Sequence, residues 1–112
     1  MPKIGQGLLT SGRECQGTLR VVDTIPDVLR LMREDLSDVV LFMQSASATA
    51  ATPLFAKIKG IVCTAGGATS HLAIVAREFD LPCVMASAME YTNGLDGSRV
   101  SLNQKGEIFL DN

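Results

Sequence analysis

The sequence contains few aromatic residues and only one histidine. Of its 112 residues, 4% are aromatic and none is tryptophan. Recognition of nucleic acids by base stacking needs exposed aromatic rings, and this chain has few of them. The net charge at pH 7 is −2, and the lysine and arginine residues are scattered along the chain. We therefore expect no nucleic-acid or anionic-membrane surface.

Long apolar runs are also missing. No run approaches the roughly 18 residues that a membrane helix needs. The first seven residues, MPKIGQG, lack the apolar core of a signal peptide, so we expect a cytoplasmic protein. Hydrophobic residues make up 46% of the chain, which suffices for one core. We expect a single domain over residues 1–112 that folds without a disulfide or a metal.

The three cysteines show no Cys-x-x-Cys spacing. In a cytoplasmic protein they are expected to be reduced. Cys63, Cys83 and His71 are of the right type to bind zinc, but their spacing does not resemble a zinc motif. Burial of the cysteines as small apolar residues is the favoured interpretation, and we expect no metal site.

Hydrophobic spacing predicts an alternation of strands and helices. The polar, glycine-rich residues 1–17 predict a loop-like lead-in. Strands are expected over residues 18–22, 38–43, 61–63, 83–85, 98–102 and 107–110, the last two forming a hairpin. Helices are expected from Thr24, over 53–58 before Gly60, and over 70–79. Periodicity alone indicates an α/β or α+β fold.

Two of these helices carry apolar stripes that predict core positions. The first stripe contains Val28, Leu31 and Met32. The second has the spacing i, i+3, i+4, i+7 and contains Leu72, Val75, Ala76 and Phe79. His71 lies off the second stripe, on a flank shared with Ile74 and Glu78. A core histidine would be expected within the stripe, so we expect His71 at an exposed edge.

The histidine follows a glycine pair where a loop is expected to become a helix. Gly66 and Gly67 allow a tight turn and a close approach of the backbone to a ligand. Thr69 and Ser70 can cap the helix and bond a phosphate oxygen. The amides of the first turn favour an anion. We therefore predict His71 as a catalytic nucleophile toward phosphorus, with the other four residues binding the phosphate.

The same residues carry a family resemblance. The string Gly-Gly-Ala-Thr-Ser-His-Leu-Ala-Ile-Val-Ala-Arg-Glu over 66–78, followed by Leu-Pro-Cys-Val, resembles the mobile phosphohistidine domain of PEP-utilising enzymes. That family includes PEP synthase, pyruvate phosphate dikinase, rifampicin phosphotransferase and phenylphosphate synthase. Residues 10–12, 39–42, 52–55 and 95–110 extend the resemblance. It implies an α/β class, swivelling β/β/α fold, with a central sheet or barrel flanked by helices and a closing antiparallel hairpin.

The resemblance also implies a function. His71 would accept a phosphoryl group from ATP or phosphoenolpyruvate and pass it between partner active sites. In the family, partner domains or subunits of ATP-grasp-like and PEP/pyruvate-barrel-like type bind these substrates, with Mg²⁺ on those partners. This domain itself is expected to bind no cofactor. In some relatives the threonine two places before the histidine is phosphorylated, and Thr69 has that position.

Several alternatives stay open at this stage. The Gly66-Gly67 loop can instead serve a non-catalytic module that binds a phosphate ligand or a protein. Residues 44–52 are a surface loop on composition, whereas the resemblance favours hydroxyl groups near the phosphate. Arg77 can reach a phosphate or form a surface ion pair. The sequence also departs from the family around the site, at Thr10-Ser11-Gly12, at Ala65 and over residues 85–88.

Overall fold

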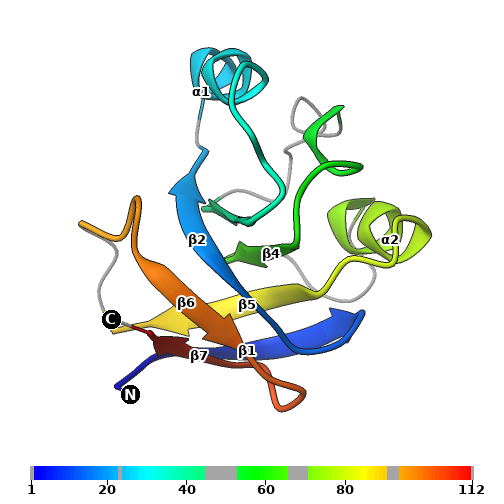
Figure 1. Ribbon diagram of the computed structural model, residues 1–112. Helices are drawn as coiled ribbons and strands as arrows, with labels where there is room; N and C mark the ends of the chain where they lie inside the picture. Colours follow the sequence, from blue (N-terminus) through cyan, green and yellow to red (C-terminus); the bar gives the residue numbers. More distant parts are fainter. Residues whose placement is uncertain (1, 23, 45–52, 66–70, 91–93, 112) are drawn as a thin grey trace.

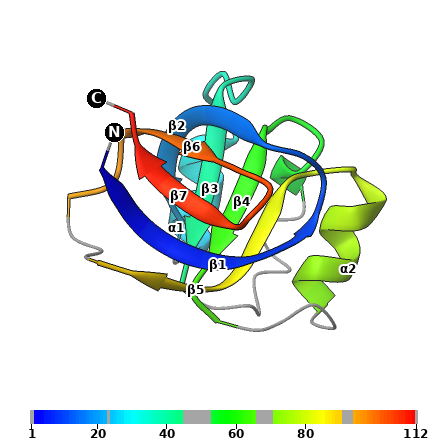
Figure 2. The same ribbon diagram turned by 90° about the horizontal axis from the view of Figure 1, so that it is seen from below.

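Seven strands form a closed barrel with two helices on its outside (Figures 1 and 2). The structure is a computed structural model that describes residues 2–22, 24–44, 53–65, 71–90 and 94–111. The strands are β1 (Lys3–Ser11), β2 (Cys15–Val21), β3 (Val39–Met43), β4 (Gly60–Cys63), β5 (Cys83–Met89), β6 (Arg99–Leu102) and β7 (Glu107–Leu110). The helices are α1 (Ile25–Leu31) and α2 (His71–Glu78). No helix of these described ranges is long and apolar enough to cross a membrane.

The barrel combines a parallel half with an antiparallel half. The strand order is β1-β5-β4-β3-β2-β6-β7, and β7 pairs back to β1. Strands β2 to β5 run parallel, while β1, β6 and β7 pair in antiparallel fashion. The closing hairpin pairs Val100 with Leu110 and Leu102 with Ile108. The expected α/β fold with a barrel, flanking helices and a closing hairpin is therefore confirmed.

The core has two layers that share the strands of the parallel half. One layer fills the barrel and receives side chains from all seven strands, including Val40 and Phe42 of β3. The other lies between the barrel and the helices and includes Leu41 and Met43 of the same strand. β3 is thus buried on both faces, which explains its continuous apolar sequence.

Helix α1 begins where the sequence predicts. The Thr24 hydroxyl accepts the Asp27 amide hydrogen at 3.3 Å, and the Asp27 carboxylate accepts the Thr24 amide hydrogen at 3.1 Å. This reciprocal capping box satisfies two backbone donors at the helix start. Val28 and Leu31 are buried as expected. Met32 is not, because the helix ends at Leu31, and the Met32 side chain is 45% exposed.

The prediction of a loop-like lead-in over residues 1–17 is wrong. Residues Lys3–Ser11 form β1, and β2 begins at Cys15. Gly7, one of the glycines that suggested a loop, is required by close packing. A Cβ atom on Gly5 would lie 2.5 Å from Met89 Sδ, and one on Gly7 would lie 2.6 Å from Val84 Cγ1. The same Cβ atom on Gly7 would lie 2.7 Å from the Met85 carbonyl oxygen, so glycine lets the β1 backbone pack tightly against β5 at this position. At Gly5 the near atom is the end of a flexible methionine side chain.

The short helix expected over 53–58 is reduced to a tight turn. The Lys57 amide donates to the Leu54 carbonyl at 3.0 Å, and Gly60 begins β4 instead of ending a helix. Leu54, Phe55 and Ile58 are all buried. Burial of three side chains within five residues fixes this segment by packing.

Strand β5 contains an irregularity opposite Gly7. Gln6 pairs with Ala88 and Leu8 pairs with Met85, so Gly7 alone faces Ala86 and Ser87. Two residues opposite one define a β-bulge. Ala86 has a φ of 53°, in the left-handed region that side chains with a Cβ rarely adopt.

Replacement of Ala86 by glycine is expected to stabilise the fold. The left-handed backbone costs alanine about 1–2 kcal/mol. The greater freedom of glycine in the unfolded chain offsets about 0.4–1 kcal/mol of that gain. We expect Ala86→Gly to raise the free energy of unfolding by about 0.5–1 kcal/mol in urea denaturation. Ala88→Gly, at an exposed position of the same strand without a positive φ, is the control and should lower it. If both substitutions lower the free energy of unfolding, the backbone at Ala86 is not strained.

Candidate functional site

The histidine begins helix α2 and is exposed to solvent. The helix packs beside β1 and β5 on the outside of the barrel (Figure 1). His71 and its neighbours Ile74 and Glu78 are all exposed, so the flank expected to lie off the apolar stripe does lie off it. An imidazole in this position is accessible to a donor or an acceptor.

The residues predicted to bind the phosphate cannot be compared with the structure. Gly66, Gly67, Thr69 and Ser70 lie outside the described residues, as do residues 45–52 of the hydroxyl-rich segment. Their roles stay predictions. The described part of the site consists of the end of β4, residues 64–65 and the whole of α2.

The buried face of α2 differs in part from the expected stripe. Leu72 and Ala76 are buried as expected, and Ala73 joins them. Val75 is partly buried against the same core. Phe79 is 41% exposed, because it follows the last helical residue. Its ring packs edge-on against Phe55, with ring centres 6.1 Å apart.

Arg77 connects α2 to the barrel. Its Nε donates to the Thr10 carbonyl of β1 at 3.2 Å. Neither of the two roles considered from the sequence, a phosphate contact or a surface ion pair, describes this hydrogen bond. The guanidinium holds the C-terminal half of the helix that His71 begins. Asp80, with a φ of 55°, turns the chain away after the helix.

Hydrogen bonds also hold the chain just before the undescribed segment. The Thr64 amide donates to the Met43 carbonyl at 3.1 Å, and its hydroxyl donates to the Gln44 carbonyl at 3.4 Å. On the other side, the Ser87 hydroxyl donates to the Cys63 carbonyl at 3.0 Å. No sequence pattern pointed to this contact, because it joins residues 24 positions apart.

The cysteines do not gather around the histidine. Cys63 and Cys83 are fully buried, while His71 is exposed. Over the described ranges, no group of three His, Cys, Asp or Glu side chains can hold a metal ion. Burial raises the pKa of the Cys15 and Cys83 thiols to about 11 and also raises that of Cys63. All three thiols are therefore neutral at physiological pH.

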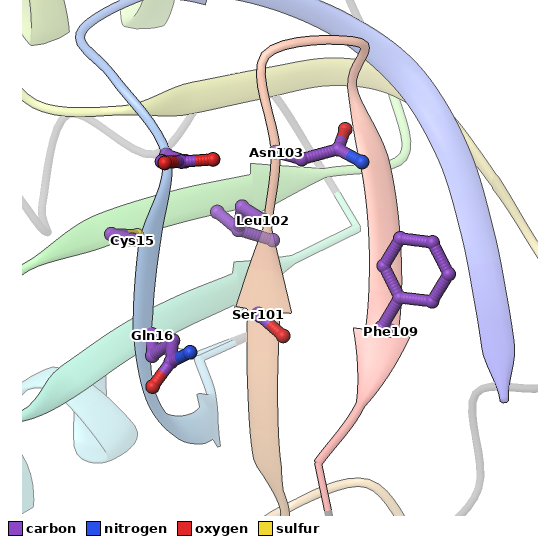
Figure 3. A pocket seen from close by; sticks show the side chains of 7 residues that line it. Cys15, Gln16, Ser101, Leu102, Asn103 and Phe109 are labelled. Atoms are coloured by element: carbon purple, nitrogen blue, oxygen red, sulfur yellow. The ribbon is translucent and has the colours of Figure 1, made fainter. Parts of the chain in front are cut away.

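A pocket of about 430 Å³ lies on a different part of the barrel (Figure 3). Gln16, Ser101 and Phe109 occupy directly opposed positions on β2, β6 and β7. The remaining lining residues are Glu14, Cys15, Leu102 and Asn103. None of the lining residues belongs to α2 or to the segment before it. This pocket is therefore separate from the predicted histidine site.

Comparison with known families settles the class of the domain. Residues 36–106, more than half of the chain, match the family described as the PEP-utilising enzyme, mobile domain. The chain belongs to this family. The matched region contains all of α2, the segment before it and the turn that closes the hairpin. The resemblance of the histidine motif to this mobile domain is thus confirmed at the level of the family.

Longer proteins contain sequences similar to this mobile domain. Rifampicin phosphotransferase of Bacillus subtilis (strain 168) is 33% identical over 97 residues, which are 87% of this chain and 10% of that protein. Its Bacillus cereus counterpart is 31% identical over the same shares. Chondramide synthase cmdD of Chondromyces crocatus is 32% identical over 105 residues, 93% of this chain and 3% of that protein. The chain thus spans a tenth or less of the length of these relatives.

Solved structures share the fold of the mobile domain at low sequence identity. A chain of Thermococcus kodakaraensis aconitase X in its holo-form matches with a TM-score of 0.66 and 16% identity over 100% of both chains. A UPF0107 protein solved by NMR matches with a TM-score of 0.67 and 12% sequence identity, over 97% of this chain and 100% of that chain. Muramoyltetrapeptide carboxypeptidase of Oxalobacter formigenes matches with a TM-score of 0.61 and 15% sequence identity, over 96% of this chain and 48% of that chain. At these identities the similarity concerns the fold alone.

Removal of the Arg77 side chain is expected to loosen α2. Arg77→Ala should lower the free energy of unfolding by about 0.5–1 kcal/mol, the range for one hydrogen bond near the surface. Amide exchange should also accelerate in α2. The matched control is Arg33→Ala, an exposed arginine after α1, which should change stability by less than about 0.5 kcal/mol. Equal effects of the two substitutions would show that Arg77 does not hold the helix.

The raised thiol pKa values predict a loss of stability in alkali. The pKa of Cys83 rises from its ordinary value of 9.0 to about 11 in the folded protein. The folded state therefore disfavours the thiolate, so the contribution is intact below pH 9 and declines as the pH rises toward 11. Urea denaturation at several pH values should show a shallower decline for Cys83→Ala than for the natural chain. Val100→Ala, which removes buried volume but no thiol, should keep the natural slope. If stability declines equally with pH in all three proteins, the pKa of Cys83 is not raised in the folded state.

Proposed function

We propose that this mobile domain carries a phosphoryl group on His71 between active sites on partner domains or subunits. The observation that carries the proposal is the position of the only histidine, exposed at the first described residue of α2 within the family-matched region. A helix start favours negative charge, because its first amides lack partners inside the helix and the dipole is positive there. A phosphorylated imidazole at this end is compatible with that field.

The proposed reaction has two half-reactions. In the first, a neutral ring nitrogen of His71 attacks a phosphorus atom of ATP or phosphoenolpyruvate. The P–N bond forms as the P–O bond to the leaving group breaks, and the electron pair leaves with that oxygen. In the second, an acceptor atom attacks the same phosphorus, and the P–N bond breaks to return the electron pair to the imidazole. Positioning and charge stabilisation dominate the rate of such transfers.

We place the binding sites for the phosphoryl donor and acceptor on other domains or subunits. The matched residues make up 10% or less of each relative's length, and two of the three relatives described above are named phosphotransferases. We assign nucleotide binding to an ATP-grasp-like partner and phosphoenolpyruvate or pyruvate to a barrel-like partner, with Mg²⁺ bound there. Gly66, Gly67, Thr69 and Ser70 are proposed to hold the phosphate while it is on His71. A cytoplasmic location, where the three thiols stay reduced, fits this role.

Labelling in an extract of the source cells tests this function. The purified domain is incubated with the extract and radiolabelled ATP or phosphoenolpyruvate. We expect one acid-labile, base-stable phosphoryl group on the natural domain and none on His71→Ala. Glu78→Gln, on the same exposed flank of α2, is the control and should keep the label. A label that persists in His71→Ala rejects the proposal. Binding of either donor without covalent transfer would instead favour a non-catalytic binding module.

A further inference from the structure

The pocket on the outer face of the antiparallel half has no part in the proposed function. β6 and β7 lie away from both described helices, so their outer face stays uncovered (Figure 1). The hollow on this face has a volume of about 430 Å³ and is lined mainly by residues of β2, β6 and β7. Sites for small ligands commonly have this size. A smaller hollow of about 300 Å³ adjoins it, since Glu14 and Asn103 line both.

Side chains of unequal length form the larger hollow. Gln16 of β2 and Phe109 of β7 lie directly opposite Ser101 of β6, one on each side. Opposed residues of antiparallel strands share one face, with their Cβ atoms about 5 Å apart. Figure 3 shows Ser101 between its two longer neighbours. Because serine is much shorter than glutamine or phenylalanine, the row has a gap over Ser101, and the paired strands fix the position of this gap.

The floor of the larger hollow has an unused hydrogen-bonding group. The Ser101 Oγ atom is buried and has no hydrogen-bond partner within the described part of the chain. A buried hydroxyl group without a partner costs free energy. Rotation about χ1, between staggered positions, can turn this oxygen toward the hollow. A polar ligand group at this point would supply the missing partner, and Gln16 adds an exposed amide beside it.

Asn103 lines both hollows and is held in place by three hydrogen bonds. Its Oδ1 accepts the amide hydrogens of Lys105 and Glu107, both at 3.0 Å. Its Nδ2 donates to one carboxylate oxygen of Glu107 at 2.9 Å, and the other oxygen pairs with Lys3 Nζ at 3.1 Å. The Glu107 carboxylate is therefore already paired. Among the described residues, nothing accepts the second amide hydrogen of Asn103, so this hydrogen is available to a ligand.

Two charged side chains of the smaller hollow, Glu14 and Lys105, are exposed and available to a ligand. Over the described ranges, neither the Glu14 carboxylate nor the Lys105 ammonium group forms an ion pair. Hydrogen bonds from Asn103 and Lys3 lower the pKa of Glu107, and the charge of Lys105 adds a smaller effect. One anionic and one cationic group thus face the smaller hollow. A ligand that carries both charges close together would complement them.

We propose that the two adjoining hollows bind a free α-amino acid with a neutral side chain. The Glu14 carboxylate accepts hydrogen bonds from the ligand's ammonium group, while Lys105 and the second amide hydrogen of Asn103 hold its carboxylate. The ligand's side chain lies in the larger hollow, over Ser101 and against the Phe109 ring. None of the lining residues belongs to α2, so this binding is distinct from the proposed phosphoryl transfer.

NMR titration of the isotope-labelled protein tests this site. Each natural amino acid with a neutral side chain is added at neutral pH, up to about 20 mM or its solubility limit. The N-acetyl and carboxamide derivatives of the best ligand follow, because each lacks one of the two charges, as the residues at the ends of a peptide do. Glu14→Gln and Lys105→Gln each remove one charge of the protein. Glu78→Gln and Lys57→Gln, at exposed positions outside both hollows, are the matched controls.

We expect amide shifts to change over residues 14–16 and 101–109 and to stay constant in α2, with a dissociation constant of about 1 mM. Glu14→Gln should weaken binding of the free amino acid about fivefold, the factor for one exposed charge pair, and leave the affinity for the N-acetyl derivative unchanged. Lys105→Gln should act in the same way toward the carboxamide derivative. Both controls should keep the natural affinity. Ser101→Leu, which fills the larger hollow, should abolish binding while the rest of the amide spectrum is retained.

The amino-acid site is rejected if no amino acid changes these shifts, or if the changes lie elsewhere on the domain. Equal binding of the free amino acid and both derivatives would also overturn it, because neither charge would then be recognised. Stronger binding of one derivative would identify the end of a peptide as the ligand in place of a free amino acid. Equal affinities of Glu14→Gln and Glu78→Gln would show that Glu14 does not hold the ammonium group. These results do not involve phosphorylation of His71, so they are separate from the test of the proposed function.

Discussion

Close backbone packing of β1 against its neighbours is the constraint on which the barrel depends. β1 pairs with both β5 and β7 and so closes the sheet. The Gly7 amide donates to the Gly106 carbonyl at 2.8 Å, and a Cβ atom on Gly106 would lie 2.1 Å from the Gly7 carbonyl oxygen. Side chains at these positions would force the strands apart. Gly7 also lies opposite the bulge in β5, so the same glycine serves both the closure of the barrel and the bulge.

Much of this fold could be predicted from local sequence signals. The continuous apolar sequence of β3, the alternating pattern of β6 and the cap at Thr24 each depend on residues near one another in the chain. The start of β1 could not be predicted in this way. Its glycines have the composition of a loop, and the close approach of β5 that requires glycine at position 7 is visible only in three dimensions.

In the candidate site, too, local features could be predicted and long-range contacts could not. The exposure of His71 followed from its position relative to an apolar stripe, which is a local pattern. Phe79 and Met32 departed from their predicted stripes because each lies just past the end of its helix, where helical periodicity no longer applies. The contacts of Arg77 with Thr10 and of Ser87 with Cys63 join residues far apart in the chain, and no periodicity could indicate them.

These features describe a closed barrel with an exposed histidine on the helix that packs beside β1 and β5. The central claim is that the imidazole of His71 itself carries the phosphoryl group. The most direct measurement is tandem mass spectrometry, at neutral pH, of the protein isolated from its source cells. The account predicts a phosphoryl group on a ring nitrogen of His71. A phosphoryl group found only on other residues, with His71 unmodified under conditions that preserve phosphohistidine, would contradict it.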